Sequence, residues 1–292
     1  MANNFGAIIK ETWSTNLQIQ LRENFVGRMI ANTKFDGSFV GSDTVNFPRQ
    51  AKLTIGTLAD FNAVLTEQDL TTANETFVLD QIRYFAFRLN ITDSIETYID
   101  PKNQTYVDSR EWFSREYDRA ILGQYANAGY VLDDWDMETA TNGGAGNPII
   151  TSKDNIFDMV TAQNEILDTA NVPENNRFMI LDPIRKRQIK NSPLLNRATT
   201  KWDDLVRKGF FGDIDDTNIG FSNGLTSAAG TIHALGGQGK PVSFASNLKP
   251  QVFVGSIAES SNFTFQVKGA TKFGVKTFTE WSERLVDIQI KA

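Results

Sequence analysis

Alternation of apolar and polar residues predicts two β-strands in the first hundred positions. Residues 45–55 alternate in this way, with an interruption at Pro48 of the kind that edge strands tolerate. Residues 85–91 alternate again, and residues 76–79 extend that run towards the N-terminus. We expect the two runs to pair as a long hairpin. Residues 56–74 between them are much longer than an ordinary hairpin loop, so the hairpin needs a neighbouring subunit to cover it.

A period of three to four residues predicts one long helix over residues 106–127. Trp112, Phe113, Tyr117 and Ile121 recur at that spacing, which places them along one side of a helix. Residues 1–35 mix helical spacing with departures from it. We interpret them as an arm, followed by a short helix, that docks on another surface.

Residues 151–190 predict a helix, a strand and a second helix. Thr151 is the expected cap of the first helix, whose buried stripe starts at Ile156. Residues 178–181 are continuously apolar and predict a short buried strand. Asp182 and Pro183 then supply an N-cap and a proline at the first helical position. A unit of this kind belongs to an α/β layer.

The C-terminal part of the chain predicts loops and then strands. Residues 213–239 are rich in glycine and are expected to form loops. Residues 252–254 predict a second buried strand of the α/β layer, and residues 263–268 alternate as a strand does. Residues 285–291 predict a final strand that returns to the first sheet. The order of elements therefore predicts an α+β protein with an α/β part.

Composition excludes several chemistries. The 292 residues contain no cysteine, which excludes disulfide bonds, thiolate nucleophiles and cysteine-ligated metals. The one histidine, His233, leaves a Ser-His-Asp triad formally possible but excludes a site with two imidazoles. It lies in the glycine-rich segment and is expected to be an ordinary loop residue. Hydrophobic residues make up 40% of the chain, which is enough for a core held by burial alone.

Charge argues against binding of nucleic acid by phosphate neutralisation. The formal net charge is −6, whereas such binding needs clustered cations. One basic cluster, residues 185–187 with Lys190, sits at helical spacing and is expected to be a solvated helix face. Apolar runs are too short for a membrane span, and the N-terminus lacks the pattern of a secretion signal. We therefore expect a protein that is made and used in a cytoplasm, without a membrane.

Three polar segments could carry chemistry, and each has a simpler interpretation. The acidic run from Asp133 to Glu138 could hold the carboxylates of a glycosidase or of a metal site, but an acidic loop accounts for it better. Residues 213–218 fail the calcium-loop template, and residues 236–240 fail the phosphate-loop template at both ends. We expect the latter to be a flexible loop. The sequence predicts no catalytic residue, no cofactor and no metal, and therefore no enzyme.

Four short segments occur in an order that is similar to a known family. They are Asn3-Asn4-Phe5, residues 41–49 (GSDTVNFPR), residues 65–70 and Tyr84-Phe85-Ala86-Phe87. This ordered set resembles tailed-bacteriophage major capsid proteins of the HK97-type fold, and within them the branch of the phage P22 coat protein without its inserted domain. The order of elements carries the resemblance over essentially the whole chain, and the motifs carry it over the first hundred residues.

The resemblance implies an α+β fold with four parts. Residues 1–35 resemble the N-terminal arm, and residues 36–90 resemble the extended loop, a β-hairpin that reaches over a neighbour. Residues 91–150 and 270–292 resemble the peripheral domain with its long spine helix. Residues 151–269 resemble the α/β axial domain around the centre of a capsomer.

The resemblance also implies a function and its partners. It implies hexamers and pentamers that tile an icosahedral shell around double-stranded DNA, assembled in a host bacterial cytoplasm and present in the virion. A separate scaffolding protein, a portal protein and a decoration protein are expected partners. The expected contacts between subunits are Phe5, Trp13, Arg49, Leu58, Phe61, Leu65, Glu67, Asp69 and Arg115. Two alternatives remain: another virion component, such as a tail or sheath protein, and a carbohydrate-active hydrolase that works as a monomer.

Overall fold

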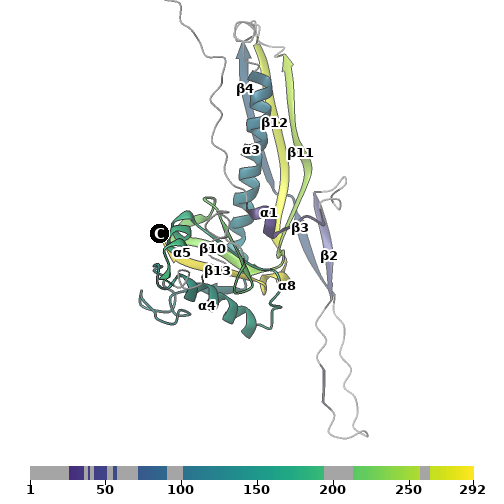
Figure 1. Cartoon of the computed structure of the whole chain (residues 1–292). Coiled ribbons are helices and arrows are strands. Elements are labelled where there is room, and N and C mark those ends of the chain that lie inside the picture. The colour runs from purple at the N-terminus through teal and green to yellow at the C-terminus, as the bar shows by residue number, and fades with distance from the viewer. Residues whose placement is uncertain are drawn as a thin grey trace, which may run out of the picture.

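The computed structural model describes residues 26–35, 39, 43–50, 55–57, 72–90, 101–193, 213–256 and 264–292. In this part of the chain, an elongated sheet with one long helix stands away from a compact α/β unit, and a two-stranded hairpin lies beside the elongated sheet (Figure 1).

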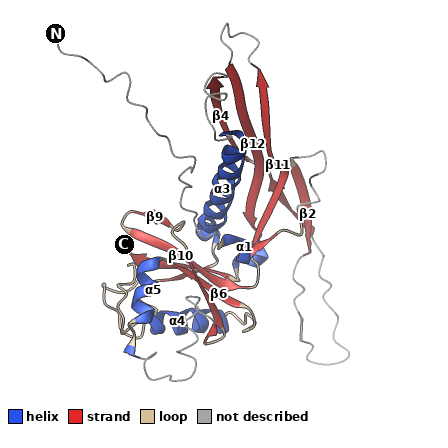
Figure 2. Ribbon diagram, turned by 45° about the horizontal axis from the view of Figure 1, so that its top comes forward, coloured by secondary structure: helices blue, strands red, loops and turns tan. Residues whose placement is uncertain are grey.

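The elongated sheet is built from strands that are far apart in the sequence. Its order is β1 (Ala31–Asn32), β11 (Val242–Ser256), β12 (Thr264–Thr277) and β4 (Gln81–Asn90). Helix α3 (Pro101–Leu122) lies along β4 and β12 in both views, and the 3₁₀ turn η3 (Gly123–Asn127) continues it (Figures 1 and 2). The predicted long helix is therefore confirmed, with an earlier start and a tighter last turn.

The compact unit has a sheet of seven strands among the described residues. The strand order is β5 (Tyr130–Leu132), β13 (Leu285–Lys291), β10 (Thr231–Gln238), β6 (Arg177–Leu181), β8 (Thr217–Phe221) and β7 (Asp213–Ile214), and β9 (Thr226–Ala228) pairs with β10. Helices α4 (Ile156–Thr169) and α5 (Pro183–Lys190) accompany this sheet (Figure 2).

Both faces of the compact sheet are buried, and β6 shows how. Met179 and Leu181 pack into one cluster with residues of α4 and α5, whereas Phe178 and Ile180 pack into another cluster with α1 (Gly27–Ile30) and the end of α3. Successive side chains of a strand point to opposite faces, so a strand covered on both sides reads as a continuous apolar run. The predicted buried strand over these residues is confirmed.

The hairpin of β2 (Thr44–Gln50) and β3 (Thr72–Val78) differs from the predicted one. β2 pairs with β3, so the expected pairing holds for residues 76–78 of the second run. β4 pairs with β12 instead, so the expected pairing is wrong for residues 85–90. Leu79, between β3 and β4, is buried, and its N–H donates to the carbonyl of Asp43 at 2.9 Å. Gly274 of β12 leaves space for the Val78 carbonyl, where a Cβ would clash. The chain therefore passes from one sheet to the other at this point.

The destinations of the last strands also differ from the prediction. β11, which contains residues 252–254, lies in the elongated sheet and not in the α/β layer. β13 lies inside the compact sheet between β10 and β5, and does not return to the first sheet. Its side chains are buried from Leu285 to Ile288 on both faces, and only a central position provides such burial. The division into four named parts stays a prediction.

Two further local predictions are wrong. Residues 213–239 contain strands β7 to β10 and are not a series of loops. Helix α4 starts at Ile156 behind Asn155, and Thr151 does not cap it. The Thr151 hydroxyl instead accepts from the Arg185 guanidinium at 3.0 Å. By contrast, Asp182 caps α5 as predicted, because its carboxylate accepts from the N–H of Ile184 at 3.3 Å.

Candidate functional site

Helix α3 covers one face of the elongated sheet through aromatic contacts. The Tyr117 ring centroid lies 4.7 Å from that of Phe273 and 5.1 Å from that of Phe244. The Tyr117 hydroxyl is hydrogen-bonded to the Thr271 hydroxyl. Further along, Arg83 of β4 forms an ion pair with Glu116 at 3.0 Å. Arg83 of β4 and Thr271 and Phe273 of β12 therefore face the helix.

The other face of the same sheet is covered by the hairpin at Ala245 and Gly274 but is exposed at β4. Ile82 and Tyr84 of β4 retain 59% and 78% of their surface, and they are paired in register with Lys272 and Ala270 of β12. Side chains opposite each other in a ladder share a face. The described chain thus presents an apolar and basic strip beside the hairpin, which is unusual for large apolar side chains unless a partner covers them.

An aromatic cluster holds the foot of the β2–β3 hairpin. Phe278 lies 5.4 Å from Phe47, 5.7 Å from Phe35 and 5.4 Å from Trp281, measured between ring centroids. Phe77, on the facing strand, is fully buried in the same cluster. Edge-to-face aromatic pairs add to the free energy of burial. The aromatic cluster therefore stabilises the packing of the foot of the hairpin against the rest of the subunit.

Charged residues fasten the same foot at its rim. Arg49 forms an ion pair with Glu280 at 3.2 Å. The Glu75 carboxylate accepts from the N–H of Thr279 at 3.1 Å and pairs with Lys276 at 3.3 Å. A pocket of about 250 Å³ lies between the aromatic and charged groups. The orientation of the hairpin therefore depends on contacts with the segment that follows β12.

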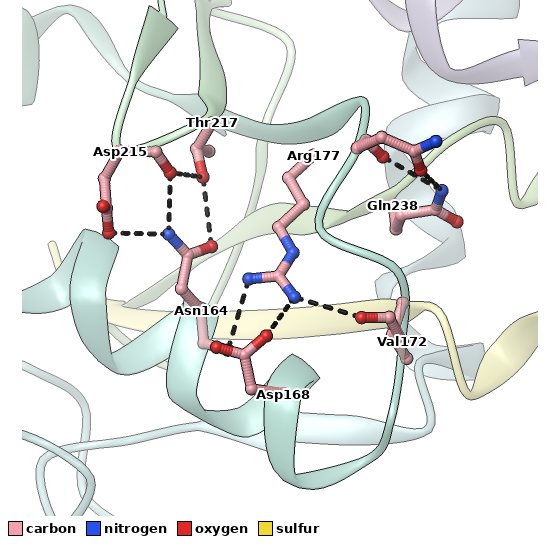
Figure 3. A network of polar contacts seen from close by, with 8 residues as sticks. Asn164, Asp168, Val172, Arg177, Asp215, Thr217 and Gln238 are labelled. Carbon is pink, nitrogen blue, oxygen red and sulfur yellow. Dashed lines mark hydrogen bonds and ion pairs between the residues drawn. The ribbon is translucent and has the colours of Figure 1, made fainter.

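A buried polar network fixes the C-terminal half of α4 to the start of the compact sheet's strands (Figure 3). The Asn164 amide donates to the Asp215 carboxylate at 2.9 Å and accepts from the Thr217 hydroxyl at 3.1 Å. Arg177 pairs with Asp168 and donates to the carbonyl of Val172 at 3.1 Å. These hydrogen bonds join α4 to the first residues of β6 and β8, while the Nε of Arg177 has no hydrogen-bond partner among the described residues.

The acidic run after α3 organises its own loop. Asp134 is completely buried, and its carboxylate accepts from the N–H groups of Thr141 at 2.9 Å, Asn142 at 2.6 Å and Gly144 at 3.0 Å. Burial raises the pKa of Asp134, but these hydrogen bonds outweigh burial and the pKa is lowered. The interpretation as an acidic loop is confirmed, and the carboxylate serves the loop's structure.

His233 is not a loop residue as predicted. It lies in strand β10, where its Nδ1 contacts the Asp287 carboxylate at 3.0 Å. Its ring stacks on Tyr125 of η3, with 4.1 Å between centroids. Burial raises the pKa of Asp287, although hydrogen bonds from His233 and Gln289 lower it in part. The stacked pair of His233 and Tyr125 joins the compact sheet to the end of the long helix.

The other polar segments also have structural roles. Gly236 and Gly237 lie in β10 and not in a flexible loop; a Cβ on Gly236 would clash with the Gln163 amide, and one on Gly237 with the Arg284 carbonyl. Arg185 is buried against Asp182 at 3.1 Å, so the basic cluster is only partly solvated. Within the described ranges, no group of three or more metal-ligating side chains occurs. No helix among the described residues is long and apolar enough to cross a membrane.

The structure places two of the predicted contact residues. Arg49 lies in β2 at the foot of the hairpin, and Arg115 lies half-buried on α3. They sit on different elements and do not form one site. The other candidates lie outside the described residues: Phe5, Trp13, Leu58, Phe61, Leu65, Glu67 and Asp69.

Sequence patterns did not predict the exposed strip around Tyr84 or the aromatic cluster at Phe278. The Tyr84 segment was recognised as a motif, but its exposed face depends on pairing with β12. The spacing of Phe278 and Trp281, which is three residues in a short turn before β13, was the available signal for an aromatic anchor.

Comparison with solved structures shows where this architecture occurs. A structure from Mycobacterium phage Che8 has a TM-score of 0.79 at 17% identity and covers 98% of both chains. The capsid asymmetric unit of cyanophage Pam1 has a TM-score of 0.74 at 13% identity, covering 98% of this chain and 97% of that one. The capsid of cyanophage P-SCSP1u has a TM-score of 0.71 at 14% identity, covering 98% and 94%.

The likeness extends over the whole chain, and it shows the fold. The protein has the mixed α+β, HK97-like fold of phage capsid subunits, and the predicted fold class is confirmed. No protein-family model matches the sequence, and no curated protein matches it.

Proposed function

We propose that this chain is the major capsid protein of a tailed phage. Many copies form hexamers and pentamers that close into an icosahedral shell around double-stranded DNA. The observation that carries this proposal is the likeness to phage capsid structures over 98% of the chain. A fold by itself does not define a function, so the surfaces of this chain have to support the same conclusion.

The shape of the subunit supports assembly over a monomeric role. The elongated sheet and the hairpin project from the compact unit (Figure 1), and the bare strip with Ile82 and Tyr84 lies on one of these projections. Projections that expose large apolar side chains gain stability when a neighbouring copy covers them. A repeated head-to-tail contact closes into a ring when the rotation between neighbouring copies adds up to a full turn.

The acidic clusters support a structural role over a hydrolytic one. Both oxygens of Asp134 are occupied by loop N–H groups, and Asp215 is held by Asn164. A general acid or nucleophile needs a carboxylate that can reach a substrate. We therefore propose that the chain is not an enzyme and uses neither cofactor nor metal.

The finer assignments rest on the sequence motifs of the first hundred residues. We propose the branch of the P22 coat protein, with residues 1–35 as the arm and 36–90 as the extended loop. In this proposal, residues 91–150 and 270–292 form the peripheral domain with its spine helix, and residues 151–269 form the axial domain. The predicted contact residues, from Phe5 to Arg115, would act between subunits. Separate scaffolding, portal and decoration proteins complete the proposed partners, with assembly in the bacterial cytoplasm and a final place in the virion.

Electron microscopy of the purified chain tests the proposal. The chain is expressed alone and with a co-expressed candidate scaffolding protein, and we expect closed shells or rings with five and six subunits. Open tubes would instead indicate a tail or sheath protein. Uniform monomers under both conditions would contradict the proposal, and a screen for glycosidase activity would then follow.

A further inference from the structure

A groove beside the compact sheet combines an exposed indole with two acidic groups. It has a volume of about 460 Å³ and lies between the loop after β5 and the outer side of α4. Trp135 forms one wall and keeps 70% of its surface exposed. The full lining, called here the Trp135 groove, is Tyr130, Trp135, Asp136, Ala162, Glu165, Ile166, Thr169 and Ala170.

Hydrogen bonds and packing within the subunit hold both walls of the Trp135 groove. The backbone N–H of Trp135 donates to the Asp133 carboxylate at 2.8 Å, in the loop that Asp134 organises. Gly144 lies under the indole, where a Cβ would be 3.2 Å from the ring. The opposite wall is α4, whose inner side is fixed by the network of Asn164 and Arg177 (Figure 3). Exposed aromatic side chains held in one orientation are typical of residues that dominate protein interfaces.

The acidic groups of the groove lack a counter-charge. Asp136 and the exposed Glu165 have no basic side chain within ion-pair distance among the described residues. Burial raises the pKa of Asp136, a hydrogen bond from the backbone N–H of Asp133 lowers it in part, and the negative charges of Asp133 and Glu165 raise it further. A cation placed between these carboxylates and the indole would gain from both, because ring faces also attract cations.

Helix α5, which carries Arg187, lies at the other end of strand β6 from the end of α4. β5, β13 and β6 run in the same direction, since β10 is antiparallel to both β13 and β6. The α4 wall of the groove, residues 162–170, leads into the start of β6, whereas α5 begins where β6 ends. Helix α5 presents exposed Arg187 with exposed Ile184 one turn before it, a basic and apolar pair on one side of the helix. The groove and α5 therefore meet between copies more readily than within one.

We propose that the Trp135 groove receives helix α5 of a second copy of this chain, with Arg187 of that copy between Trp135 and the carboxylates of Asp136 and Glu165. This contact rests on the proposed function. It specifies how neighbouring copies join, because the groove of one copy meets helix α5 of the next. A contact between unlike surfaces propagates around a ring, and charge complementarity sets its register.

Cross-linking in assembled particles tests this contact directly. The chain has no cysteine, so Glu165→Cys with Arg187→Cys introduces the only two thiols. A short bismaleimide added to assembled shells is expected to give a ladder of linked subunits on a denaturing gel. The matched control pairs Lys153→Cys, an exposed position away from the groove lining, with Arg187→Cys and is expected to stay monomeric. Normal shells that give no ladder would overturn the proposed contact.

Charge reversal gives an independent readout. Glu165→Arg alone and Arg187→Glu alone should each raise the subunit concentration needed for assembly at least about tenfold, since like charges would meet. The double variant should restore most of the loss, because the pair is rebuilt with opposite polarity. Single variants that assemble like the unmodified chain would overturn the contact. If the unmodified chain forms neither rings nor shells, the proposed function fails and this inference fails with it.

Discussion

The carboxylate of Asp134 should be the main support of the loop over residues 133–147, and Asp134→Asn measures its contribution. The amide has the same shape but only one acceptor oxygen. Its less harmful orientation places the NH₂ group where Oδ1 lies, because the Thr141 hydroxyl, 3.2 Å away, can turn to accept from it. The N–H of Thr141 then loses its acceptor, while Asn142 and Gly144 keep a neutral one.

The magnitude follows from these hydrogen bonds. One buried N–H without a partner costs about 1–3 kcal/mol, and the change of two bonds from charged to neutral acceptors costs about 1 kcal/mol more. We therefore expect the free energy of unfolding to fall by about 2–4 kcal/mol. This difference in the free energy of unfolding between the variant and the unmodified chain should have its full size at neutral pH. It should shrink as pH falls below 3.8, because the native pKa of Asp134 lies lower than the unfolded value and protonation removes the wild-type advantage.

Urea unfolding of the unassembled subunit provides the assay, with the midpoint and slope fitted together. Asp154→Asn is the matched control, since Asp154 is exposed and its carboxylate has no hydrogen bond within the described residues; it should change the unfolding free energy by less than about 0.5 kcal/mol. Equal stability of Asp134→Asn and the unmodified chain at pH 7 would refute the assignment of Asp134 as the loop's support.

Four further outcomes are expected. Phe278→Ala should lower the unfolding free energy by about 3–5 kcal/mol, because it opens a cavity under the hairpin. Tyr84→Ala, on the exposed strip, should leave the unfolding free energy nearly unchanged. Equal effects of the two variants in urea unfolding would contradict the aromatic anchor. Gly236→Ala should cost about 1–3 kcal/mol through the clash with Gln163, and Gly123→Ala, which meets no atom within 4 Å, should not. A raised native pKa means that the folded state loses stability when the Asp287 carboxyl ionises, as pH rises from 3.8. Asp287→Asn should remove this loss. An unchanged slope of the unfolding free energy against pH would contradict this role of Asp287. Deletion of residues 58–71, which lie outside the described residues, should leave a folded subunit by circular dichroism and prevent closed shells in electron microscopy, and normal shells would rule out the extended-loop assignment.

Elements encoded by neighbouring residues could be predicted from the sequence. The apolar run from Phe178 to Leu181 is a buried strand, and Asp182 with Pro183 starts α5 as expected. The long helix was also found, although its start at Pro101 was missed by five residues from the expected Tyr106. These signals depend on backbone geometry and caps within a few residues, so no knowledge of distant segments was needed.

Sequence patterns predicted only part of the candidate surfaces. The acidic run was noticed, but Trp135 within it was not, because its exposure depends on the hydrogen bonds that fold the loop around Asp134. Arg185 was expected in solvent, yet it is buried because the Lys291 carbonyl and Thr151 come to it from distant segments. A charged side chain's surroundings are set by its neighbours in space.

The sequence by itself determined the α+β class, the long helix, the β6–α5 unit and, through its ordered motifs, the likeness to capsid proteins. Only the tertiary structure decided which strands pair: β4 with β12, β13 between β10 and β5, and the glycine-rich segment as a central strand. An alternating pattern specifies that a strand has a buried face, but not which distant strand supplies its hydrogen bonds. That choice is made by packing, as at Gly274 and Gly236, where the absence of a side chain lets another segment approach.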